Sequence, residues 1–97
     1  MKYSFKQLIN RSYQAIVNRG LITKTTQKAQ FIIKLKEELQ EVVDAYILED
    51  KTEDDYAEEL TDLATVCIMQ LTHLGYDFEE EFKKCVEKNE RRAKERH

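Results

Sequence analysis

Two acidic pairs near the middle of the chain constrain its fold more than any other feature. Glu38 and Glu41 stand in LKEELQEVVDAY, and Glu59 and Asp62 stand in AEELTDLATV. Each pair is spaced i,i+3, which places both carboxylates on one face of a helix, one turn apart. The two pairs lie symmetrically about Asp50, in the turn-like segment LEDKTED. This symmetry predicts two helices that fold back on each other at that turn.

An antiparallel hairpin would bring all four carboxylates to the same height. The expected helices cover residues 26–48 and 53–74, with each pair about 10 residues, or roughly 16 Å, from the turn. Four anions in a partly desolvated groove repel one another unless a cation neutralises them or some stay protonated. Oxygen-only ligation suits Mg²⁺ or Mn²⁺ better than Zn²⁺. Because 19 of the 97 residues are Asp or Glu, a solvated acidic face is the competing interpretation.

Apolar residues run directly beside both acidic pairs, which chance supplies less readily than the pairs themselves. The first helix carries Leu35, Leu39, Val42 and Tyr46, and the second carries Leu60, Leu63, Ala64 and Cys67. Helix bundles build metal sites from facing helices of this kind. From this pattern alone, a metal site and a solvated acidic face are interpretations of equal weight.

Composition predicts one all-α domain over residues 1–97. Hydrophobic residues make up 41% of the chain, enough for one core, and Pro is absent with only two Gly, so the turn signals of an all-β fold are missing. Cys67 and Cys85 fall at core-facing positions and are expected to be buried free thiols.

Targeting and partner signals are few. No segment approaches 18 uncharged apolar residues, and MKYSFKQLINRS lacks the apolar run of a signal peptide, so we expect a cytoplasmic protein without a membrane partner. The net charge of −3 argues against nucleic-acid binding.

Two more helices complete the expected fold. One covers Ser4 to Asn18, and the other follows Asp77, which forms a capping box with Glu80. The helix at 53–74 is apolar almost all round, so a second subunit is expected to cover part of it. His73 lies too far from Asp62 to share its ion and is interpreted as an interface or surface residue.

The acidic motif also resembles a known family. EELQEVVDAY followed by EELTDL resembles the ExxE…ExxD signature of the all-α nucleotide pyrophosphohydrolases, and the surrounding residues are most similar to the MazG group. GYDFEEEFKKCVEKNERR is similar to the end of the same domain, where a helix carries Lys-Asn and then Arg. The resemblance runs from about Lys34 to Arg92, over half the chain.

The resemblance implies a bundle-like domain of four helices that assembles as a homodimer or a dimer of dimers. It implies Mg²⁺, with Mn²⁺ possible, on the four motif acids, and hydrolysis of the α-β phosphoanhydride of nucleoside triphosphates to a monophosphate and pyrophosphate in nucleotide-pool house-cleaning. Glu41 or Glu38 would take the proton of the attacking water. The residues implied at the substrate phosphates are Lys88, Asn89 and Arg92. Helix 1 and a neighbouring subunit would line the base pocket.

Several alternatives stay open at this level. Lys34 lies one turn before Glu38, where it could offset the acidic cluster, reach a substrate phosphate or form an ordinary exposed ion pair. Glu37 and Asp44 compete for the ligand role and rank lower only because of the family pattern. An enzyme like phosphoribosyl-ATP pyrophosphatase is one competing function, and a non-catalytic helical metal-binding or interaction module is the other. The four intact acids favour activity.

Overall fold

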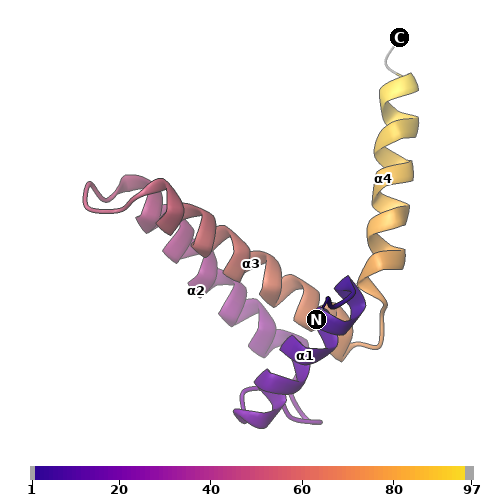
Figure 1. Cartoon of the computed structure of the whole chain (residues 1–97), viewed down its shortest axis with the longest axis horizontal. Helices are drawn as coiled ribbons and strands as arrows, with labels where there is room; N and C mark the ends of the chain where they lie inside the picture. Colours follow the sequence, from indigo (N-terminus) through magenta and orange to yellow (C-terminus); the bar gives the residue numbers. More distant parts are fainter. Residues whose placement is uncertain (1, 96–97) are drawn as a thin grey trace.

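The structure, a computed structural model, describes residues 2–95 and contains four α-helices over that range (Figure 1). The helices are α1 (Phe5–Asn18), α2 (Lys28–Ile47), α3 (Glu53–His73) and α4 (Phe78–Glu95). The predicted all-α class is confirmed. Among these helices, none has both the length and the hydrophobicity needed to cross a bilayer.

Capping residues fix where the helices begin. The Ser4 hydroxyl accepts a hydrogen bond from the Gln7 backbone N–H at 3.1 Å, and the Gln7 side chain accepts from the Ser4 N–H at 2.8 Å. Thr52 and Asp55 form the same reciprocal box at the start of α3. Each box satisfies N–H groups that the first helical turn leaves free. Both starting points agree with the sequence prediction.

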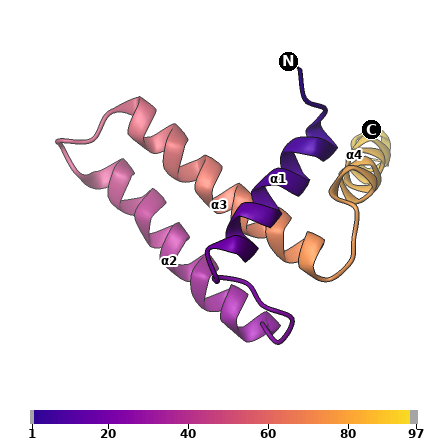
Figure 2. The same ribbon diagram turned by 60° about the horizontal axis from the view of Figure 1, so that its bottom comes forward.

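Helices α2 and α3 form the predicted antiparallel hairpin, with the turn at residues 48–52 (Figures 1 and 2). Val42 and Ala45 of α2 are buried. Leu39 and Tyr46 of the predicted apolar stripe are exposed instead, and so is Cys67, which corrects the expectation of a buried thiol there. The hairpin therefore keeps much apolar surface uncovered.

The main core lies at the open end of this hairpin, where α1 crosses it (Figure 2). Ile9, Ile22, Phe31 and Met69 form the buried cluster, and Met69 is only 2% exposed. Helix α1 and the linker after it thus cover the part of α3 that was expected to face a second subunit. Because apolar residues at α-helical spacing show only that a face is covered, the sequence could not identify the cover as α1.

His73 ties three segments together at this core. Its Nε2 lies 2.9 Å from the Thr26 carbonyl oxygen, and its Nδ1 lies 3.0 Å from the Tyr13 hydroxyl. A carbonyl oxygen only accepts, so in the neutral ring Nε2 donates and Nδ1 accepts from Tyr13. The residue is half-buried inside one chain. His73 therefore has a structural role within the chain, and its position at a subunit interface stays a prediction.

Helix α4 leaves this assembly at a sharp corner and extends away from the other helices (Figure 1). Gly75 at the corner has a φ of 89°, a conformation that glycine adopts without the steric cost of a side chain. The radius of gyration is 16.0 Å, whereas a compact chain of this length would have about 12.5 Å. The hairpin and α4 extend in different directions, so the chain is less compact than one globule of its length (Figure 1).

Candidate functional site

Three carboxylates converge on the hairpin between α2 and α3. Glu38, Glu41 and Glu59 each place a carboxylate oxygen within 4.8 Å of the other two. Glu38 is 6% exposed, Glu59 is half-buried and Glu41 is exposed. The hairpin therefore brings together three of the four predicted metal ligands, from two helices. We call this group the acidic cluster.

Asp62, the fourth predicted ligand, is exposed on α3 and lies outside the acidic cluster. A fourth carboxylate would add like-charge repulsion to the group, and an exposed side chain relieves that repulsion by turning into solvent. Asp62 is one helical turn after Glu59, so it is adjacent to the acidic cluster, but its carboxylate is not part of it. Its role as a ligand stays a prediction.

Two carboxylate oxygens of the cluster lack hydrogen-bond partners. They are Oε2 of Glu38 and Oε2 of Glu59, and both atoms are buried. A buried anionic oxygen without a donor costs free energy, so such a pair favours a bound proton or cation. Glu38 and Glu59, with Glu41 beside them, are thus suitable ligands for a divalent cation. Their all-oxygen donor set fits Mg²⁺ or Mn²⁺.

Lys34 supplies the positive charge next to the cluster. Its Nζ lies 3.1 Å from Oε1 of Glu38 and 3.7 Å from Oε2 of Glu37. The hydrogen bond to Glu38 raises the pKa of Lys34, because it favours the charged amine. These contacts fit both the role that offsets the acidic charge and that of an exposed i,i+4 ion pair, while a contact of Lys34 with a substrate phosphate stays a prediction.

The neighbouring carboxylates raise the pKa of Glu41. Hydrogen bonding with Glu38 and repulsion from its charge raise the pKa of Glu41, desolvation adds to this, and Glu59 acts in the same direction. Each influence disfavours a third negative charge in the group. A bound cation would relieve the repulsion that raises the pKa of Glu41.

A cavity of about 320 Å³ opens beside Lys34 and Glu37, between α1, the linker, α2 and α3. Most of its wall is apolar, from Ile16, Leu21, Ile22, Phe31, Val66 and Met69. The polar lining residues are Thr26, Gln30, Lys34, Glu37 and Thr65. Helix 1 was expected to line a base pocket, and Ile16 does line this cavity. The contribution of the linker residues was missed because linker side chains carry no periodic signal.

Lys88, Asn89 and Arg92 are exposed on α4, and the single chain does not bring this helix to the acidic cluster (Figures 1 and 2). Asn89 donates to the sulfur of Cys85 on the same helix, at 3.8 Å. The sequence places these residues at a suitable spacing on one helix. It could not show the direction in which that helix leaves the α3 corner.

Four helices with carboxylates gathered between two of them define an all-α protein suited to hold a divalent cation in its helical hairpin. The model of the MazG nucleotide pyrophosphohydrolase domain matches residues 26–97. The chain therefore belongs to the MazG family, which confirms the resemblance. Searches of the curated proteins and of the solved structures gave no significant match. The family match begins after α1, whereas the single domain over 1–97 stays a prediction.

Proposed function

We propose that this chain is a Mg²⁺-dependent hydrolase that cleaves the α-β phosphoanhydride of nucleoside triphosphates. Its family membership supports nucleotide pyrophosphohydrolase activity in general. The observation that carries the more specific proposal is the acidic cluster, with its two buried oxygens that lack hydrogen-bond partners. A group of this kind, next to a largely apolar cavity, suits a ligand with an anionic end and a flat apolar end.

Each residue of the site has a distinct task in this mechanism. Glu38 and Glu59, whose Oε2 atoms are buried and unpartnered, would hold the cation, and Lys34 contacts the other oxygen of the Glu38 carboxylate, Oε1. A divalent cation in this position neutralises phosphate charge and lowers the pKa of water. Glu41 is the exposed member of the cluster, so it is the carboxylate that a substrate water reaches most easily.

The reaction balances with these groups. The oxygen of water attacks the α-phosphorus while its proton passes to a Glu41 carboxylate oxygen. The bond from the α-phosphorus to the α-β bridging oxygen breaks, and pyrophosphate leaves with that oxygen. The other product is the nucleoside monophosphate. The cavity beside Lys34 would hold the base, which suits a house-cleaning enzyme that selects its substrate by base.

A pyrophosphate-release screen tests this proposal. Canonical nucleoside triphosphates, damaged nucleotides and phosphoribosyl-ATP would each be incubated with the protein in Mg²⁺ and in EDTA. We expect release with at least one triphosphate, in Mg²⁺ only, and loss of release in Glu38→Gln. Glu49→Gln is the matched control, because it removes the same charge from an exposed position in the turn. Activity confined to phosphoribosyl-ATP would instead favour the histidine-pathway type of enzyme.

A non-catalytic metal-binding module is the second candidate. It is favoured by one observation, the separation of α4 from the acidic cluster within a single chain. Such a module would be stabilised by Mg²⁺ in a thermal melt, through residues of the acidic cluster, without releasing pyrophosphate from any nucleotide. The melt and the release assay together therefore distinguish the two functions.

A further inference from the structure

The linker between α1 and α2 contains a turn at residues 23–26 that is held together by its own threonines. The Thr23 backbone N–H donates to the Thr26 hydroxyl at 2.9 Å, and the Thr26 N–H donates to the Thr23 carbonyl oxygen at 3.1 Å. The Thr25 N–H donates to the Thr23 hydroxyl at 3.3 Å. Bonds of this kind satisfy backbone donors locally. We call residues 23–26 the threonine turn, and one firm contact to the rest of the chain is enough to fix its position.

His73, the last residue of α3, makes that contact. Its Nε2 donates to the Thr26 carbonyl oxygen, and over residues 2–95 no other side-chain hydrogen bond joins the threonine turn to another element. The ring is itself fixed, because Nδ1 accepts from the Tyr13 hydroxyl on α1 and the ring centroid lies 5.4 Å from that of Phe31 on α2. The hydrogen bond to Thr26 therefore ties the threonine turn to α1, α2 and α3 together.

The threonine turn also belongs to the wall of the cavity beside Lys34. Thr26 and Phe31 line this cavity and also a second one of about 420 Å³, in which His73 is a lining residue. The two residues thus form a wall with the first cavity on one side and His73 on the other. Ile22, which precedes the turn and lines the first cavity, is only 5% exposed. A shift of the turn would therefore change the shape of the cavity.

We propose that His73 is a positioning residue, which holds the linker wall of this cavity in place and so sets how tightly and how selectively the cavity takes its ligand. It acts through Thr26 and Phe31, which lie between it and the cavity. Glu59 precedes it by fourteen residues, or about 21 Å along α3, so His73 is remote from the acidic cluster. Loss of its hydrogen bonds should loosen the wall and spare the carboxylates. That the ligand is a nucleotide rests on the proposed function.

Amide hydrogen exchange tests the positioning role without any assay of activity. His73→Phe keeps an aromatic ring beside Phe31 but has no ring nitrogen to bond the Thr26 carbonyl. We expect the linker amides to exchange at least about 10-fold faster in this variant, because the wall then opens locally. Amides of residues 38–45 in the hairpin should change less than about twofold. The linker amides to follow are those with hydrogen bonds in the structure, namely Leu21, Thr23 and Thr26.

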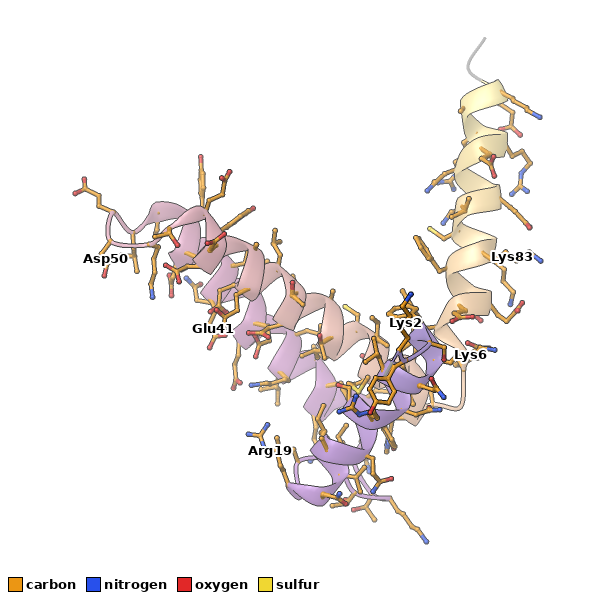
Figure 3. The ribbon with its side chains drawn as sticks, in the orientation of Figure 1. Lys2, Lys6, Arg19, Glu41, Asp50 and Lys83 are labelled. Atoms are coloured by element: carbon orange, nitrogen blue, oxygen red, sulfur yellow. The ribbon has the colours of Figure 1, made fainter. Side chains whose placement is uncertain are left out.

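Two further variants serve as controls. His73→Gln offers an amide N–H in place of Nε2–H and should restore most of the protection of the linker. Lys6→Ala removes a different contact of α1, the ion pair at 3.1 Å between Lys6 Nζ and Oδ2 of Asp77, and should leave the linker unchanged. Lys6 and Arg19 lie toward opposite ends of α1 in Figure 3, and Arg19 is the first residue after that helix.

Unchanged exchange in the linker of His73→Phe would overturn the proposal. Equal acceleration of all amides would overturn it too, because His73 would then stabilise the fold as a whole. If His73→Phe does not fold, Tyr13→Phe takes its place, since it removes only the hydroxyl that holds Nδ1. The same local pattern is expected there with a smaller rise, about threefold, and its absence would count against the proposal in the same way.

Steady-state kinetics on the triphosphate found in the release screen test the effect on selectivity. His73→Phe should raise KM about 10-fold and leave kcat within about twofold, because ligand binding is weakened while the carboxylates are untouched. The ratio of kcat/KM between the best and the next triphosphate should fall, since a looser wall discriminates less. His73→Gln should recover both values in large part.

The failures of this proposal and of the proposed function differ. Faster linker exchange in His73→Phe with unchanged KM and unchanged selectivity would leave His73 a purely structural residue and overturn its positioning role. A wild-type protein that releases no pyrophosphate would instead reject the proposed function. The hold of His73 on the cavity wall would then be decided by the exchange of the linker amides alone.

Discussion

The α2–α3 hairpin and α4 differ in how far their apolar residues are buried. Phe31 and Met69 of the hairpin are buried under α1, and its three clustered carboxylates come from its own two helices. Helix α4 has a similar division into apolar and charged sides, yet none of its residues is buried. The hairpin and α1 therefore form one packed unit, and the hairpin alone supplies the acidic cluster. Helix α4 keeps Phe82 and Val86 exposed in this chain.

The largest expected effect is at the acidic cluster of the hairpin. Glu38→Gln keeps the shape of the side chain but removes a buried anionic ligand. We expect activity to fall at least about 1000-fold, because the metal's several kcal/mol of charge stabilisation is lost. The rise in thermal midpoint with Mg²⁺ should also disappear. In the wild type, Mg²⁺ at 100 times its dissociation constant should add about 2.7 kcal/mol of stability. A variant that kept both its rate and its Mg²⁺ response would reduce the cluster to a solvated acidic face.

Truncations of apolar residues separate the two regions by stability. Met69→Ala should cost about 2–5 kcal/mol at any protein concentration, because it empties a buried site within one chain. Phe82→Ala should cost less than about 0.5 kcal/mol in dilute protein, where α4 has no cover, and more as subunits associate. Urea titrations at two protein concentrations measure both. A concentration-independent loss at Phe82 would show that α4 is already covered inside its own chain.

Removal of a basic residue from α4 should weaken substrate binding and spare the metal. We expect Lys88→Ala or Arg92→Ala to raise the nucleotide dissociation constant about 10- to 100-fold, as for the loss of one charge-assisted hydrogen bond. The Mg²⁺-dependent rise in thermal midpoint should stay at the wild-type value. Calorimetry with a non-hydrolysable nucleotide provides the measurement, and Lys83→Ala serves as the control on the same helix.

The smallest effect concerns the exposed ion pair that anchors α4. Its hydrogen bond with Lys6 lowers the pKa of Asp77 from 3.8, so this contribution is present above that pH and is lost as pH falls through the folded-state pKa. Asp77 raises the pKa of Lys6 above 10.5, so the amine's contribution is present below that pH and is lost as pH rises through its folded-state pKa. Between these limits Lys6→Ala should lower stability slightly.

A pH series of urea melts checks the anchor. The difference between wild type and Lys6→Ala should vanish in strong acid, where Asp77 is protonated. Asp77→Asn should reproduce the same profile, and the double variant should lose little more than either single variant. An unchanged difference in acid would assign the effect of Lys6→Ala to lost packing of its methylene groups.

The fold was predictable where the evidence was local. Ser4 and Thr52 are capping residues, and Gly75 ends α3 at the expected place, so three helix boundaries could be identified from side chains near in sequence. The hairpin followed from the symmetry of the acidic pairs, which is again a matter of spacing along the chain. Both predictions needed only helix geometry.

The rest depended on how helices pack across large separations. The pairing of Tyr13 with His73 joins residues far apart in sequence, and no helical periodicity indicates such a partner. The same holds for the outward course of α4 and for the exposure of Cys67. In the site, spacing placed Asp62 with the other acids, but spacing cannot tell which carboxylate turns inward and which turns into solvent.

Because α1 crosses the open end of the hairpin, the cavity wall and the acidic cluster come from different parts of the sequence. Ile16, Leu21 and Ile22 form one wall of the cavity and precede residue 26, where the family match begins. Glu38 and Glu59 lie within the matched segment. Substitutions in the first 25 residues can therefore reshape the cavity while the carboxylates keep their places. Under the proposed function, such substitutions would change the base that the cavity accepts without altering the carboxylates.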